Sequence, residues 1–288
     1  MSFRIVRIAA TGLLLTVILM MLFLAACTKE SSAADETRYV VLSPELAEII
    51  AVLEGTENIV GITEECTFPP SLAGKTIVGK FGTLNKEKII SLKPSIVFAT
   101  SLEQQAIAAE LSKLGITVFS VYPKSVSEML EGIVSVGKAI DKEARAVFVA
   151  DSLKAELEQI SKNIVNEKKP KVYLEIYREP LMSVSDQSFV GELIELAGGD
   201  NIFTTLERDY SRVKAEDVIK ANPEIIICYS QDSADNIRKR MGWKDIPAVK
   251  NNRIYYEKDI NPDWILRAGP RCVQGARRLQ ELFYGELY

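Results

Sequence analysis

Residues able to do acid–base, nucleophilic or metal chemistry are few in this chain of 288 residues. It contains no histidine, which excludes Ser-His-Asp and Cys-His catalysis and metal capture through imidazole. Its four cysteines stand singly, without a CxxC pair, so a thiolate metal site is not expected. No glycine-rich phosphate loop is present. These absences favour a binding protein without a metal or cofactor of its own over an enzyme.

Two glutamates stand out because they occupy the same place in a repeat. The segments "NKEKIISLKP" (85–94) and "KAEDVIKANP" (214–223) each carry a Glu, two apolar residues shortly after it, and a Pro seven positions on. The glutamates are Glu87 and Glu216. The simplest interpretation places each in the first turn of a helix, where the macrodipole favours an acid.

The elements around each copy are also alike. A β-branched run follows each proline, "SIVFAT" (95–100) and "EIIICY" (224–229), and is typical of a strand buried on both faces. Upstream of each copy stands a strand, an apolar helix and a second strand; downstream stands a further strand and helix. The sequence therefore predicts an α/β protein of two similar lobes, each a central sheet flanked by helices.

A single helix is expected to join the lobes. Residues 142–169 contain no Pro or Gly, and apolar residues recur there at spacings of four and three. The expected divisions are a lobe over 38–141, a linking helix over 142–169 and a lobe over 170–288. Such an arrangement forms a ligand cleft whose opening angle changes only modestly.

The first 37 residues are different in character. Arg4 and Arg7 precede an apolar run that ends in "LAAC" at Cys27, which predicts an export signal over residues 1–26. "LAAC" resembles the bacterial lipobox, in which the chain is cleaved before a cysteine that then receives lipid. Residues 27–37 read as a flexible tether. The alternative is an uncleaved membrane anchor, and either one puts the remaining chain outside the cytoplasm.

Charge argues against nucleic acid as a partner. The formal net charge of −4 becomes −6 when the two arginines leave with the signal segment, and an acidic exported body is a poor match for a polyanion. Cys228, at the end of a predicted strand, and Cys272, at the start of the last helix, could pair as a disulfide or remain buried thiols; we favour the thiols.

Six motifs in order carry a resemblance to a known family. They are "TFPP" (67–70), "GKFGTLNKEKIISLKPSIVFAT" (79–100), "LAGGDNIF" (196–203), "KAEDVIKANPEIIIC" (214–228), "GWKDIPAVKNNRIY" (242–255) and "RAGPR" (267–271). Together with the lipobox, they resemble the helical-backbone substrate-binding lipoproteins of ABC importers for cobalamin, ferric siderophores and heme. The resemblance covers nearly all of the chain from Arg38 onward.

The resemblance implies partners and site residues. In such proteins an acid on the tip of each lobe docks with an arginine pocket on a two-fold permease, and Glu87 and Glu216 match those positions. The pocket aromatics of cobalamin-binding members correspond here to Phe68, Phe81, Tyr210 and Trp264. Thr100 departs from the pattern, since those members can carry an aromatic there.

The ligand is the open part of this interpretation. We expect a monomeric, lipid-anchored protein that captures a corrinoid and delivers it to an ABC permease dimer with its ATPase. Arg178 and Arg267 are expected at the edge of the cleft. Because they are cations, a ferric siderophore remains the alternative ligand. Heme is less favoured because neither lobe supplies histidine, although tyrosine can also ligate iron.

Overall fold

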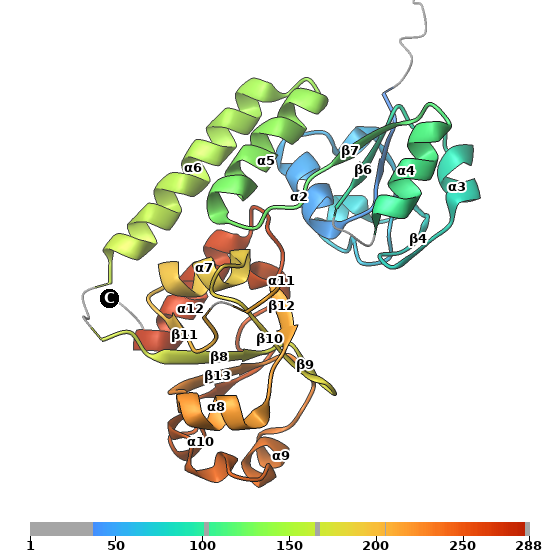
Figure 1. Ribbon diagram of the computed structural model, residues 1–288. Coiled ribbons are helices and arrows are strands. Elements are labelled where there is room, and N and C mark those ends of the chain that lie inside the picture. Colours follow the sequence, from blue (N-terminus) through green and yellow to red (C-terminus); the bar gives the residue numbers. More distant parts are fainter. Residues whose placement is uncertain (1–36, 101–103, 165–167, 205, 286–288) are drawn as a thin grey trace, which may run out of the picture. The chain divides into compact units, whose positions relative to one another are not determined.

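The computed structural model describes residues 37–100, 104–164, 168–204 and 206–285 (Figure 1). The predicted signal segment, the tether up to Glu36 and the lipidation site Cys27 lie outside the described residues. Residues 38–288 form one compact unit. Within the described residues, no helix has the length and apolar character needed to cross a membrane.

The first lobe is built on a parallel five-stranded sheet. Its strands lie in the order β3-β2-β1-β6-β7. The elements are β1 (Tyr39–Val41), α2 (Pro44–Val52), η1 (Thr56–Asn58), β2 (Ile59–Ile62), η2 (Pro70–Leu72), β3 (Thr76–Ile77), the hairpin β4 (Gly79–Lys80) and β5 (Thr83–Leu84), α3 (Lys86–Ser91), β6 (Ile96–Ala99), α4 (Gln105–Lys113), β7 (Thr117–Ser120) and α5 (Val126–Ala139).

The second lobe repeats this topology. Its parallel sheet has the order β11-β8-β13-β14, which matches β2-β1-β6-β7 strand for strand. The elements are β8 (Lys171–Glu175), β9 (Tyr177–Arg178), β10 (Leu181–Val184), α7 (Phe189–Leu196), β11 (Asp200–Asn201), β12 (Tyr210–Arg212), α8 (Ala215–Ala221), β13 (Ile225–Cys228), α9 (Ala234–Lys239), η4 (Trp243–Asp245), α10 (Pro247–Lys250), β14 (Ile254–Tyr255), α11 (Pro262–Ile265) and α12 (Cys272–Tyr284). The prediction of two similar α/β lobes is confirmed.

One insertion distinguishes the second lobe from the first. Between β8 and α7 the chain forms the antiparallel pair β9–β10, and β12 joins it to give the order β12-β10-β9. The sequence did not predict this small sheet, because its strands are only two to four residues long. Its strand β12 begins at Tyr210.

The repeated segments have the same local structure. Asn85 caps α3 by accepting a hydrogen bond from Lys88 N–H at 2.8 Å. Each helix ends before a residue in the left-handed region, Lys93 with φ 48° and Asn222 with φ 58°, and each of these precedes the proline. The chain is thereby turned from helix into the buried strand β6 or β13.

The central strands are buried on both faces, as the β-branched runs predicted. In β13, Ile225 and Ile227 belong to one apolar cluster, while Ile226 and Cys228 belong to another on the opposite face. This alternation follows from the two-residue period of a strand.

The linking helix α6 (Glu143–Lys162) is shorter than predicted. Its buried side chains include Val149, Leu153, Leu157 and Ile160, at the expected spacings. The expectation that the helix continues to Lys169 is wrong, because it ends at Lys162. The helix is capped at Asn163, whose N–H donates to the Gln159 and Ile160 carbonyls at 3.1 and 3.2 Å, and asparagine is a weak helix former. The lobe boundaries assigned from the sequence otherwise remain predictions.

Helix α6 packs along α5, and Figure 1 shows the two side by side. Gly137 of α5 lies against Ala146 of α6, where a side chain larger than hydrogen would collide. One continuous apolar cluster then runs from Tyr39 in β1 through α5, α6 and α7 to Phe283 in α12. A shared core of this kind resists large changes of angle between the lobes.

The three cysteines within the described residues are buried and form no disulfide. Cys228 contacts Ser230, and Cys272 contacts the sulfur of Met129 at 3.7 Å. The favoured interpretation of Cys228 and Cys272 as buried thiols therefore matches the structure, and the disulfide alternative does not.

Candidate functional site

A cavity of about 480 Å³ lies between the two lobes. Its walls on the first lobe follow the carboxyl ends of β1, β2, β6 and β7, which is where parallel sheets generally bind ligands. The lining residues are Pro44, Glu45, Glu65, Phe81, Thr100, Tyr122 and Pro123 from the first lobe and Ser188, Phe189, Asp209, Tyr210, Leu266, Arg267 and Ala268 from the second. We call this the interlobe cleft.

Two of the predicted aromatics line the cleft from opposite lobes. Phe81 stands at the turn of the β4–β5 hairpin, and its N–H donates to Glu65 Oε2 at 3.0 Å. Tyr210 begins β12, and burial raises the pKa of its phenol. Phe189, the first residue of α7, adds a third ring. The cleft therefore offers aromatic surface on both sides.

The other two predicted aromatics do not line the cleft. Phe68 is 41% exposed, and the Arg271 guanidinium stacks on its ring at 4.4 Å from the centroid. Trp264 lies within α11, packed against the main apolar cluster. The resemblance to the cobalamin-binding members placed these rings in the pocket but could not give the direction in which they point.

The two predicted cations are both paired. Arg267 lines the cleft, but its guanidinium contacts Asp263 at 2.9 Å and Glu48 at 3.5 Å. Arg178 lies in β9, away from the cleft lining, and contacts the half-buried Asp232 at 2.9 Å. Neither arginine is an isolated cation waiting for an anionic ligand.

Three carboxylates in the cleft were not predicted from the sequence. They are Glu45 in the first turn of α2, Glu65 after β2 and Asp209 before β12. Burial raises the pKa of the Glu45 carboxyl. The three acids lie far apart in the sequence and belong to none of the quoted motifs, so no pattern signalled that the fold brings them together.

A hydrogen bond crosses the cleft. Tyr122, just after β7, donates from its hydroxyl to Asp209 Oδ2 in the second lobe at 3.2 Å. Thr100 lies deeper, and its hydroxyl donates to the Val121 carbonyl at 2.8 Å. An aromatic side chain in place of Thr100 would have to replace that bond and fill part of the cleft.

Glu87 and Glu216 lie in the first turns of α3 and α8, as their spacing predicted. Both side chains are exposed, and neither carboxylate makes an ion pair with another described residue. They come from corresponding helices of the two lobes, so the repeat presents the same acid twice on the surface.

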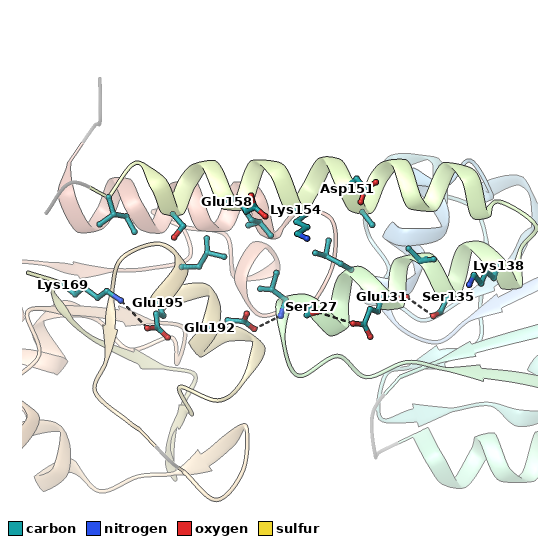
Figure 2. Close-up of a pocket in the computed structure, with 18 residues that line it drawn as sticks. Ser127, Glu131, Ser135, Lys138, Asp151, Lys154, Glu158, Lys169, Glu192 and Glu195 are labelled. Atoms are coloured by element: carbon teal, nitrogen blue, oxygen red, sulfur yellow. Dashed lines mark hydrogen bonds and ion pairs between the residues drawn. The ribbon is translucent and has the colours of Figure 1, made fainter. Parts of the chain in front are cut away.

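A larger hollow of about 1160 Å³ lies elsewhere, between α5, α6 and α7. Apolar side chains such as Leu130, Val134 and Leu157 line it together with serine, acidic and lysine side chains, and Figure 2 shows the Lys169–Glu195 pair at one end. None of the residues predicted for ligand binding lines it. We assign the site to the smaller cleft, because aromatic and polar groups of both lobes converge there at strand ends.

Within the described residues, no group of three or more Cys, Asp or Glu side chains is arranged to hold a metal ion. The fold and the cleft together define a two-lobed substrate-binding protein.

Comparison with known proteins agrees. Residues 40–270 match the periplasmic binding protein family. The uncharacterized ABC transporter substrate-binding lipoprotein YvrC of Bacillus subtilis is 30% identical, over 88% of this chain and 82% of its own length. A vitamin B12-binding protein of Vibrio parahaemolyticus is 21% identical, over 91% of this chain and 94% of its own. A possible iron-binding periplasmic solute-binding protein of Staphylococcus epidermidis superposes with a TM-score of 0.76 at 28% identity, covering 86% of this chain and 98% of that one.

The chain belongs to the periplasmic binding protein family. It is a substrate-binding protein and not an enzyme, and the resemblance seen in its motifs is confirmed.

Proposed function

We propose that this protein is the lipid-anchored, extracytoplasmic substrate-binding component of an ABC importer, and that it captures a corrinoid in the interlobe cleft. The observation that carries the proposal is the pairing of Phe81 from the first lobe with Tyr210 from the second across one cavity. A corrinoid is a broad ring with an amide-bearing rim, and such a ligand needs aromatic faces and a few hydrogen-bonding groups. The relative from Vibrio parahaemolyticus, a vitamin B12-binding protein, supports this choice.

The cleft volume bears on how the ligand is held. At about 480 Å³ the cleft is within the range of sites for drug-sized molecules, and a corrinoid is larger. Part of the ring therefore stays outside, or the lobes open slightly and the Tyr122–Asp209 hydrogen bond breaks. Capture then consists of insertion between Phe81 and Tyr210, followed by small adjustment of the lobes.

Delivery is assigned to the two surface glutamates. Glu87 and Glu216 are exposed, come from equivalent helices and make no ion pair with another described residue. A two-fold permease with arginine pockets would bind both, and two charge-assisted contacts fix orientation as well as position. Release follows when the permease spreads the lobes.

The second candidate ligand is a ferric siderophore. The structural relative described as a possible iron-binding protein favours it, whereas the pairing of Arg178 and Arg267 with acids argues against an anionic one. Heme stays less favoured, because the chain has no histidine to ligate iron.

Calorimetric titration of the full chain in mild detergent, with cobalamin, cobinamide, several ferric siderophores and heme, tests the proposal. We expect saturable one-to-one binding of a corrinoid. Tight binding of a siderophore with both corrinoids silent would keep the transport role and refute the ligand.

A further inference from the structure

We infer that the carboxylates of the interlobe cleft select ligands whose rim donates hydrogen bonds and carries no net negative charge. This inference rests on the proposed function and narrows it. It makes Glu45, Glu65 and Asp209 specificity-determining residues. The cleft and its aromatic walls form the site, and the three acids decide which of several similar chelates it accepts.

The charge balance of the lining is the first step. Three carboxylates, those of Glu45, Glu65 and Asp209, line the cleft together with a single guanidinium, that of Arg267. No other charged side chain lines the cleft among the described residues. In a partly enclosed space of low dielectric, this imbalance acts strongly on a charged ligand.

The one cation is already neutralised. Arg267 Nη2 lies 2.9 Å from Asp263 Oδ1, and its Nη1 lies 3.5 Å from Glu48 Oε1. Its side chain is only 20% exposed. A ligand carboxylate or catecholate approaching Arg267 must therefore compete with two protein carboxylates that are already in place.

The carboxylates of Glu65 and Asp209 each retain free acceptor positions. Glu65 accepts the Phe81 N–H through Oε2, and Asp209 accepts the Tyr122 hydroxyl through Oδ2. A carboxylate has about four acceptor positions, so each acid can accept further hydrogen bonds from a ligand. The hydrogen bond between the Phe81 N–H and Glu65 also holds an acceptor next to a residue that supplies an aromatic wall.

The chemistry of the candidate ligands then separates them. Primary amides on a corrinoid rim donate to carboxylates, and a cationic hydroxamate siderophore does so with an added charge attraction. A tris-catecholate siderophore is anionic, and heme carries two propionates. Juxtaposing such groups with unpaired carboxylates is a recognised means of rejecting a ligand.

Two matched pairs of probes test the inference on the full chain in mild detergent. The first pair is cobinamide and cobyrinic acid, which share the corrin ring but carry amides in one case and carboxylic acids in the other. The second pair is a cationic ferric trihydroxamate and an anionic ferric tris-catecholate. Each is titrated at neutral pH against the wild type, Glu65→Gln, Asp209→Asn and Glu64→Gln. Glu64 is the matched control, since its exposed side chain pairs with Lys80 and does not line the cleft.

We expect the wild type to bind cobyrinic acid at least roughly tenfold more weakly than cobinamide. Glu65→Gln and Asp209→Asn should reduce the ratio of the affinity for cobinamide to that for cobyrinic acid, and Glu64→Gln should leave this ratio unchanged. Equal affinity for the two corrinoids, or tighter binding of the acid, would overturn the inference while leaving the corrinoid proposal intact.

The siderophore pair tests the charge selection independently of the corrinoid proposal. If neither corrinoid binds and the cationic trihydroxamate binds in preference to the tris-catecholate, the corrinoid proposal fails and the charge selection stands. Preference for the tris-catecholate overturns the charge selection. Failure of all four probes to bind contradicts it as well, because it requires a cleft that holds one of the two favoured chelates.

Discussion

Arg271, at the start of α12, holds the carboxylate of Glu48 in α2 with two hydrogen bonds, Nε to Oε2 at 2.7 Å and Nη2 to Oε1 at 2.6 Å. The pair joins the two lobes beside the cleft, and Glu48 is only 4% exposed. Arg267 also contacts Glu48, and Asp263 contacts both arginines. A buried acid of one lobe is thus satisfied by cations of the other.

Breaking this pair should destabilise the protein. Arg271→Met leaves Glu48 buried with only the longer contact to Arg267, and removing one partner of a buried ion pair costs about 3–5 kcal/mol. We expect a decrease of about 2–4 kcal/mol in the free energy of unfolding, measured by urea denaturation, because Arg267 compensates in part.

The control lies on the same helix. Arg277 pairs with Glu156 at 2.7 Å, but the two side chains are 59% and 43% exposed, and such surface pairs contribute about 0–1 kcal/mol. Arg277→Met should therefore have little effect. An equal decrease in the free energy of unfolding for the two variants would show that the Glu48–Arg271 pair stabilises the protein no more than a surface pair does.

Aromatic substitutions should divide according to the lining of the cleft. Phe81→Ala and Tyr210→Ala remove surface from opposite walls, and each should weaken ligand binding by about tenfold or more. Phe68→Ala and Trp264→Ala should affect affinity less, since neither ring lines the cleft. Tyr177, 55% exposed and also outside the lining, supplies a control. If Trp264→Ala lost more ligand affinity than Phe81→Ala, with thermal stability unchanged in both variants, the assignment of the site to the interlobe cleft would be wrong.

The docking role predicts a change in transport without a change in ligand affinity. Glu87→Arg and Glu216→Arg place a cation where the permease is expected to present arginines, so each should reduce stimulation of the permease ATPase roughly tenfold or more, and the double variant should abolish it. Glu158→Arg on α6 is the control, with a side chain 51% exposed. Normal stimulation by the double variant would refute docking through these residues.

A pH dependence follows from Glu45. Burial raises the pKa of its carboxyl above the ordinary 4.5, so the folded chain binds this proton more tightly than the unfolded chain. The free energy of unfolding then falls as pH rises from the ordinary pKa through the raised one. Glu45→Gln is neutral at every pH, so it should be more stable than the wild type above the raised pKa. Between about pH 4 and pH 8 its free energy of unfolding, measured by urea denaturation, should decrease less than that of the wild type. Identical slopes in the two proteins would contradict the buried state of this carboxyl.

The thiols should be inert in the folded protein. Burial raises the pKa of Cys66 and Cys228, and that of Cys272 to about 12. In a Cys27→Ala variant, a thiol reagent at mildly alkaline pH should react with none of them until denaturant is added, and then with all three. Rapid reaction of the native protein would show that one of them is accessible.

The sequence was sufficient for the fold because its signals are local and repeated. The runs that become β6 and β13 are apolar at consecutive positions, and the helices before them end at a left-handed residue and a proline in both lobes. The end of α6 was misjudged, because the absence of Pro and Gly after Lys162 favoured a longer helix, whereas the helix ends before Asn163, a residue of low helix propensity.

The site was predictable only in part. Phe81 and Tyr210 line the cleft as the family pattern implied, whereas Phe68 and Trp264 turn toward Arg271 and the core. Side-chain direction depends on packing partners more than 200 residues away, such as the contact of Arg271 with Glu48. The carboxylates of Glu45, Glu65 and Asp209 gave no signal at all, because they converge only when two lobes face one another.

A crystal structure of the protein with cobinamide tests the central claim most directly. The account predicts the corrin ring between Phe81 and Tyr210, with its amides toward Glu65 and Asp209. A ring seated instead in the hollow between α5, α6 and α7, or binding that leaves the interlobe cleft empty, would contradict it.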